Sequence, residues 1–468
     1  MIGEGTATGG RRSGRGGALR RTSAILAAAL LLSLALALAI GTRPVAAADP
    51  AFGTPTATAA FGDGVTFSQP FTPFPGIRRV EILITVPGSI GPLTVEVPRS
   101  DCCAPVTLRH VLAEADGHLV PNTRFSARWR VTAEDGRTLL GDEAAVLYAD
   151  TRFDWKTVSG PIVRVHWYQG TLDFGKRALA IGEKGIDTAA SLLGVTESEP
   201  VDFFIYADQS AFYDALGPGA RENVGGEAHT DIRTMFALIS SDEIDATWVG
   251  VVVPHELTHL VFDTAVKNPY RFPPRWLNEG LAVYLSEGYT DAWRAAVEDA
   301  VRTNTIIPLD GLGSQFPTTR DQFFLAYGES VSAVDFLVRK HGKDSLVSLV
   351  RSYADGVTDD EAFKAGIGQD VAAFQAAWLA KLGAKAPVAV GPQVGPPGPL
   401  PAGWAAQPGA PGVPTGPVST AAPGGPSSTP AGSQPVPTVI GLVLAGFALA
   451  LSASYVVRTR RRRTGGLP

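Results

Sequence analysis

The stretch VVVPHELTHLVF, residues 251–262, places two histidines and a glutamate inside an apolar run. In a helix, residues four apart project from the same face, so His255 and His259 can bind one cation together. Glu256 points about 100° away from that face, where it can take a proton from a metal-activated water. The spacing predicts a metal site with a general base, as hydrolysis requires. The alternative is a polar face on a buried helix.

A third ligand comes from RWLNEGLAVYLSEG, which follows two prolines and is predicted to be a helix. It offers Glu279, with nineteen residues between it and His259. Two helices joined by a proline-rich turn can bring this carboxylate to the metal. A His-His-Glu set leaves a fourth position open for water, which is typical of a catalytic rather than a structural zinc. We therefore predict one Zn²⁺ bound by His255, His259 and Glu279.

Pro254 interrupts the backbone hydrogen bonds of the first helix, because it has no N–H and its ring disturbs the preceding turn. Either the helix begins near Pro254 or it is kinked there. The apolar run over residues 248–253 favours a kink. Both alternatives preserve the ligand geometry, which depends only on the turn after Pro254.

The segments HELTH and WLNEGLA resemble the gluzincin zinc metallopeptidases, especially the peptidase MA-like group related to the aminopeptidase and thermolysin families. The resemblance covers roughly residues 155–383 and implies an α/β lobe before the motif and a helical lobe after it. It implies that His255, His259 and Glu279 are the zinc ligands and that Glu256 is the general base.

The resemblance also implies a role for Tyr327, in the segment AYGESVSAVDFL. In the aminopeptidase branch a tyrosine at the corresponding place donates a hydrogen bond to the oxyanion. The alternative is a core tyrosine near the interface between the lobes.

The sequence departs from the family pattern in two places. NVGGEAHT, residues 223–230, lacks the Met-Glu-Asn order with which the aminopeptidase branch binds a substrate amino terminus. Val283 stands where the thermolysin branch has an aspartate that supports a ligand histidine. We expect Asp263 or a backbone carbonyl to orient the imidazoles instead. His229 either faces the cleft or, as is more common for an edge-strand histidine, is structural.

Around this motif the patterning indicates a multidomain α+β chain. Residues 49–150 contain short alternating runs such as GVTFSQPF and RFSARWRVT, separated by turn residues, which predicts a β-sandwich of immunoglobulin-like type. Residues 151–385 are predicted to form the metallopeptidase domain, with an α/β lobe followed by a helical lobe after Gly288.

Both ends of the chain indicate export. Residues 1–48 combine arginines, an apolar run and small residues before a predicted cleavage site, which is typical of a signal peptide of the ordinary secretory rather than the twin-arginine route. Residues 386–435 are rich in Pro, Gly and Ala and predict a disordered linker spanning about 40 Å. Residues 436–457 are long and apolar enough for one transmembrane helix, and the arginines of residues 458–468 favour a cytoplasmic tail.

These features predict a single-pass membrane protein whose catalytic domain lies outside the cell. The expected partner is a peptide or protein substrate. The linker is long enough for the domain to contact a cell wall. The net charge of −5 is spread thinly over 468 residues, so no nucleic-acid partner is expected. The adjacent pair Cys102 and Cys103 fits disulfide geometry poorly and lacks the partners of a zinc site. The alternative function is a non-catalytic adhesion or wall-binding protein with a vestigial zinc lobe.

Overall fold

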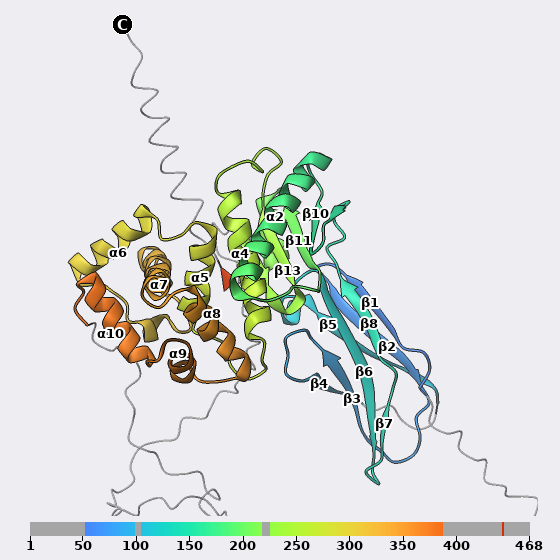
Figure 1. Ribbon diagram of the computed structural model, residues 1–468. Coiled ribbons are helices and arrows are strands. Elements are labelled where there is room, and N and C mark those ends of the chain that lie inside the picture. Colours follow the sequence, from blue (N-terminus) through green and yellow to red (C-terminus); the bar gives the residue numbers. More distant parts are fainter. Residues whose placement is uncertain (1–51, 99–103, 218–224, 387–441, 444–468) are drawn as a thin grey trace, which may run out of the picture.

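The computed structural model describes residues 52–98, 104–217, 225–386 and 442–443. It is a mixed α+β structure with β-sheets in its N-terminal part and helices in its C-terminal part, as predicted (Figure 1). The predicted signal peptide, the cysteine pair, most of the linker and the basic tail lie outside the described residues.

Two antiparallel sheets form the N-terminal part and share one apolar core, which includes Phe67, Ile82 and Trp129. Strict alternation of buried and partly exposed residues along residues 123–133 shows why these segments form strands with one face in the core. The strands of the first sheet are β1 (Thr56–Ala60), β2 (Gly64–Phe71) and β5 (Val106–Ala113). Those of the second are β3 (Ile77–Thr85), β4 (Leu93–Val97), β6 (Thr123–Ala133), β7 (Thr138–Leu140) and β8 (Ala144–Tyr148).

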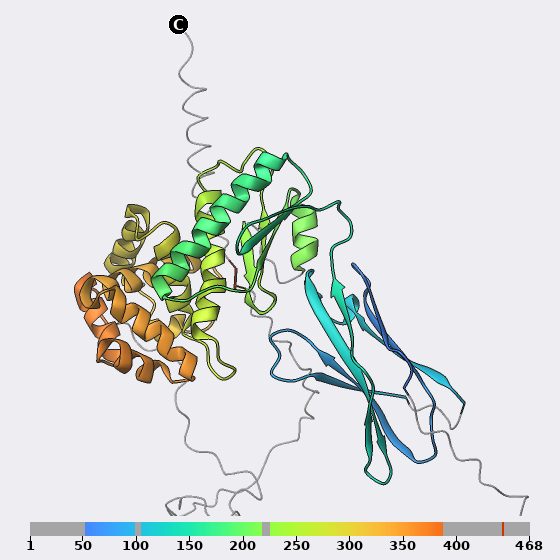
Figure 2. The same ribbon diagram turned by 45° about the vertical axis from the view of Figure 1, so that its right-hand side comes forward.

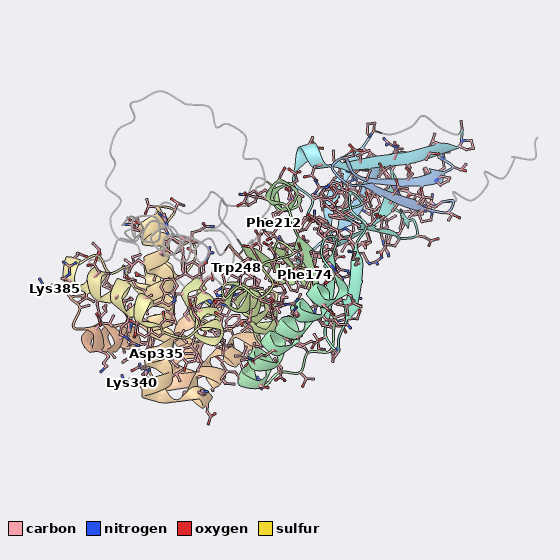
Figure 3. All side chains as sticks on the ribbon, turned by 90° about the horizontal axis from the view of Figure 1, so that it is seen from above. Phe174, Phe212, Trp248, Asp335, Lys340 and Lys385 are labelled. Atoms are coloured by element: carbon pink, nitrogen blue, oxygen red, sulfur yellow. The ribbon has the colours of Figure 1, made fainter. Side chains whose placement is uncertain are left out.

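A third sheet follows. Its strands are β9 (Lys156–Ser159), β10 (Val163–Trp167), β11 (Val201–Tyr206), β12 (Gly226–His229), β13 (Thr234–Leu238) and β14 (Leu442–Val443). They lie in the order β14-β12-β13-β11-β10-β9, with β10, β11 and β13 parallel to one another. Helices α2 (Leu172–Leu193) and α4 (Val249–Val266) cover one face, and α3 (Gln209–Leu216) covers the other (Figure 2). Phe174 and Phe212 mark the two faces in Figure 3.

The C-terminal part is helical. It contains α5 (Arg275–Ser286), α6 (Asp291–Thr303), α7 (Arg320–His341), α8 (Lys343–Ser352), α9 (Asp359–Ile367) and α10 (Val371–Leu382). α5 and α7 approach each other closely at Gly280, where an added Cβ would lie 2.4 Å from the carbonyl oxygen of Ser330. Only glycine permits this contact, which brings the residue before it, Glu279, toward Tyr327 of α7.

α4 runs without a break through Pro254, from Val249 to Val266. The alternative in which the helix begins at Pro254 is therefore wrong. Apolar residues on both sides of the proline are buried against the sheet and α2, and this packing offsets the missing backbone hydrogen bond.

The predicted transmembrane helix, residues 436–457, lies outside the described residues except for Leu442 and Val443. At these two positions the structure has strand β14, antiparallel to β12, and not a helix. The edge of β12 that faces away from β13 offers backbone N–H and C=O groups, with which an apolar segment can pair. Among residues 52–98, 104–217 and 225–386, no helix combines the length and the apolar character that crossing a bilayer requires.

One polar cluster joins the N-terminal part to the α/β sheet. Asp202 on β11 accepts hydrogen bonds from Arg164 at 2.7 Å and from Asn122 at 3.0 Å, and its Oδ1 lies 2.8 Å from His166 Nε2. Burial opposes ionisation of this carboxyl. The hydrogen bonds from His166, Arg164 and Asn122 outweigh burial and lower the pKa of Asp202 to about 2.

Replacing Asp202 by Asn should remove a pH-dependent part of the stability. Because the folded-state pKa lies below the unfolded value of 3.8, the contribution is present above about pH 4 and is lost as the pH falls toward 2. Urea unfolding at pH 6 should show Asp202→Asn less stable by about 2 kcal/mol. The deficit should shrink at pH 3. Asp245→Asn, at an exposed ion pair with Arg177, is the control and should change little. A deficit of equal size at both pH values would contradict this assignment.

Candidate metal centre

His255 and His259 of α4 and Glu279 of α5 meet in the interior, and each side chain is fully buried. One ligand atom from each lies within 4.8 Å of the others. The Nε2 atoms of His255 and His259 are 3.5 and 3.6 Å from Oε2 of Glu279. These separations exceed a normal hydrogen bond and approach the value of about 3.3 Å between two donors of a tetrahedral zinc. The structure thus brings the three predicted ligands together.

The protonation states of these residues are those that a metal requires. Burial lowers the pKa of His255 to about 4, so its imidazole is neutral near pH 7. Burial also lowers the pKa of His259. Burial would raise the pKa of Glu279, but its neighbours His255, His259 and Arg275 lower it to about 2. Two neutral imidazoles and one carboxylate fit a divalent zinc ion.

Glu256 is also completely buried, on α4 beside the first histidine. Neither of its carboxylate oxygens has a hydrogen-bond partner of normal geometry among the described residues. Burial, followed by the charges of Glu279 and Glu227, raises the pKa of Glu256 well above its ordinary value. A buried carboxylate with high proton affinity fits a general base, whereas a structural glutamate would have hydrogen bonds of normal geometry from neighbouring residues.

Strand β12 lies directly against this glutamate. A Cβ added at Gly226 would be 3.1 Å from Cγ of Glu256 and 3.0 Å from a methyl group of Val252. The glycine therefore allows β12 to approach the predicted base. His229, two residues later, pairs in register with Thr234 of β13, and its ring contacts Phe236 edge-on at 5.4 Å. It lies on the sheet face toward α3, away from the metal ligands.

Asn278 orients one of the ligand imidazoles. Nδ1 of His259 lies 2.9 Å from Oδ1 of Asn278, so a proton on Nδ1 is donated to the amide oxygen and Nε2 is left for the metal. The expectation that Asp263 has this role is wrong, because its charged neighbours are Asp231, Lys267 and Arg233. The sequence did contain a signal, since Asn278 is the polar residue that directly precedes Glu279.

Removing the Asn278 side chain should weaken zinc binding. Asn278→Ala leaves the imidazole of His259 without its acceptor, and we expect the zinc Kd to rise about 10-fold, at the lower end for such supporting contacts. Asn278→Asp keeps an acceptor oxygen, so its zinc Kd should stay closer to that of the parent chain. Competition with a chromophoric chelator measures both constants. An unchanged Kd for Asn278→Ala would show that the hydrogen bond does not support the metal.

Tyr327 of α7 is buried at the same centre. Its ring centroid is 6.4 Å from that of His255, and the charges of Glu279 and Glu256 both act on its phenol. The ring also packs edge-on against Phe316 and Phe323. Tyr327 therefore combines the two alternatives from the sequence: it is part of the core, and it lies at the predicted site.

Arg275 is a member of this centre that the sequence motifs did not indicate. It is the first residue of α5, and its Nε and Nη2 lie 3.2 and 3.1 Å from Oε1 of Glu279. The spacing of four residues on a predicted helix is the signal that could have revealed the pair.

Comparisons with known proteins cover the segment that holds this centre. Residues 182–384 match the family model described as the Peptidase MA superfamily. Over 250 residues the chain is 27% identical to aminopeptidase M1 of Arabidopsis thaliana. The aligned region covers 48% of this chain and 28% of that protein. The chain thus spans little more than a quarter of this relative.

Solved structures with a similar arrangement include two bacterial proteins. One is an aminopeptidase N family protein from Idiomarina loihiensis, with 12% identity and a TM-score of 0.40 over 71% of this chain and 78% of that chain. The other is an M1 zinc metallopeptidase from Deinococcus radiodurans, with 14% identity and a TM-score of 0.35 over 74% and 95%. The segment that holds His255, His259 and Glu279 is thus similar to the Peptidase MA superfamily and to an aminopeptidase.

Proposed function

We propose that this chain is a zinc-dependent peptidase that hydrolyses peptide bonds of peptide or protein substrates. The observation that carries the proposal is the buried His255–His259–Glu279 cluster next to the buried carboxylate of Glu256, which has no hydrogen bond of normal geometry among the described residues. When bound by these three residues, zinc would supply Lewis acidity to the scissile carbonyl and to the attacking water.

The side chains of this chain would then handle the protons and the developing charge. Glu256 takes a proton from the attacking water and passes it to the leaving amine. Tyr327 donates a hydrogen bond from its phenol to the oxyanion that forms on the carbonyl. Burial serves both steps, because hydrogen bonds and charges act more strongly where water is excluded.

The alternative, a non-catalytic adhesion or wall-binding protein, does not account for Glu256. A binding module would not need a buried carboxylate that has no hydrogen bond of normal geometry among the described residues, because burying such a group costs free energy. Catalysis accounts for Glu256, because a general base must accept a proton from water. We therefore favour the peptidase.

The first test measures zinc and peptide cleavage together, on the full chain in detergent micelles. We expect about one zinc per chain, cleavage of a peptide library, loss of cleavage with a chelator and recovery on adding zinc. Bound zinc without cleavage of any peptide would favour the adhesion alternative. The library also reports whether cleavage is internal or terminal.

We further propose the predicted location: export by residues 1–48 and anchoring by residues 436–457, with the catalytic domain outside. The support is the residue pattern of both ends. For Leu442 and Val443, crossing the membrane and pairing with β12 exclude each other. Protease treatment of intact cells decides between them: a protected C-terminal tag supports the anchor, whereas a tag released into the medium with the enzyme contradicts it.

A further inference from the structure

Arg275 is a cation held in the interior of the candidate metal centre. Only 15% of its side chain is exposed, and Glu279, one turn further along α5, is fully buried. A buried guanidinium is costly unless it is paired and hydrogen-bonded. The contacts that it makes therefore indicate what this region of the site requires.

In the first contact, the two oxygens of the Glu279 carboxylate face different partners. Both guanidinium nitrogens contact Oε1, at 3.2 and 3.1 Å, while Oε2 faces the histidine Nε2 atoms at 3.5 and 3.6 Å. With Oε1 held by Arg275, the carboxylate cannot rotate to offer both oxygens to an ion. The geometry selects a single donor atom, which keeps one coordination position open.

The second contact reaches across to α7. The guanidinium of Arg275 lies close enough to the phenol of Tyr327 for its positive charge to act on it. Phe316 lies beneath the guanidinium, 4.8 Å from ring centroid to Cζ, and packs edge-on against Tyr327 at 5.3 Å. The aromatic ring thus holds the plane of the arginine in place.

We propose that Arg275 is a positioning residue that couples the metal ligand Glu279 to the oxyanion donor Tyr327. Its planar fork orients one oxygen of the carboxylate toward the metal, and its charge, together with the Phe316 ring, holds the phenol of Tyr327 beside that carboxylate. The Tyr327 half of this statement rests on the proposed function, whereas the Glu279 half concerns metal binding alone. Lysine cannot replace Arg275, because one ammonium on a flexible stem does not hold the carboxylate oxygen with two coplanar N–H groups.

Another intrahelical pair shows what an ordinary ion pair looks like in this chain. Arg339 and Asp335 of α7 are also four residues apart and 2.7 Å from each other. The Arg339 side chain is 71% exposed, so water screens the pair and its contribution is small. Arg339→Met is therefore the matched control for Arg275→Met: the same chemical change, at the same helical spacing, away from the site.

The experiment uses four variants of the full chain: Arg275→Met, Arg275→Lys, Tyr327→Phe and the double variant Arg275→Met/Tyr327→Phe. Arg339→Met is the control. Zinc Kd is measured by chelator competition, and kcat and KM on a peptide cleaved by the parent chain. Cobalt(II) absorption spectra report the coordination geometry. Melting temperatures check folding, and if Arg275→Met does not fold, Arg275→Lys replaces it in the single and the double variant.

We expect Arg275→Met to weaken zinc binding about 10-fold or more and to change the cobalt spectrum. At saturating zinc, kcat should fall about 100-fold with KM nearly constant, because the loss lies in the transition state. Tyr327→Phe alone should lower kcat by about the same factor. In the Arg275→Met background, adding Tyr327→Phe should lower kcat almost no further. Arg275→Lys should recover little of the kcat, and Arg339→Met should match the parent chain.

Two results would overturn the proposal. An unchanged zinc Kd and cobalt spectrum in Arg275→Met would show that the arginine does not position Glu279. A full Tyr327→Phe effect in the Arg275→Met background would show that it does not position the tyrosine. If the parent chain binds zinc but cleaves no peptide, the proposed function fails instead, and the zinc and cobalt measurements still decide the Glu279 half.

Discussion

Glu256→Gln should abolish peptide hydrolysis while zinc stays bound. Glutamine has the size of glutamate and fits the same buried space, but it cannot accept a proton from water. Acid–base groups contribute about 10²- to 10⁴-fold to rates, and because Glu256 handles the proton in both steps we expect kcat to fall by at least 10³-fold. The zinc Kd should remain within about 3-fold, since Glu256 is not among the three residues whose ligand atoms cluster.

A matched control is available in Glu329 of α7. It too is fully buried, and both of its oxygens accept from the backbone N–H of Ile307, at 3.1 and 3.2 Å. Burial raises the pKa of Glu329 well above its ordinary value, so the neutral glutamine is a close substitute. Glu329→Gln should keep the parent activity. Turnover by Glu256→Gln equal to that of this control would remove Glu256 from the mechanism.

Glu279→Gln should lose both zinc and activity. The amide is a neutral and weaker ligand, and Arg275 loses the charge that it pairs with. Zinc held by four protein ligands is bound by about 10–16 kcal/mol, so one ligand contributes roughly 3 kcal/mol, or about a 100-fold change in Kd. At zinc concentrations that saturate the parent chain, the variant should be nearly inactive, and excess zinc should restore part of the activity.

Glu287→Gln, at the end of the same helix, is the control for this substitution. Glu287 accepts a hydrogen bond from the indole of Trp293 at 2.7 Å, and a glutamine oxygen can do the same. Its zinc content and kcat should equal those of the parent chain. Should Glu279→Gln retain one zinc with parent affinity, the third ligand of the site would have to be another residue.

Much of this architecture could be predicted because its determinants are local. Alternation of apolar and polar residues marks β2 and β6, and apolar residues at helical spacing mark α2, α6 and α7. The same holds for the pair of histidines, since helix geometry alone places His255 and His259 on one face. These inferences need only the period of the element and the residues within it.

The prediction that failed depended on a partner distant in sequence. Asp263 is as close to His259 in sequence as His255 is, yet Asn278, from the next helix, makes the contact. The deciding group belongs to another element, which the pattern around His259 does not contain.

Residue types and spacings were thus enough to identify two imidazoles, a carboxylate and a base suited to zinc chemistry. The packing of α5 against α7 decided which neighbours those groups received. At Gly280 the two helices come into contact closer than any side chain allows, and this proximity brings Arg275 and Tyr327 together beside Glu279. A contact between helices about fifty residues apart leaves no trace in the periodicity of either one, because it depends on shapes that exist only once both are folded.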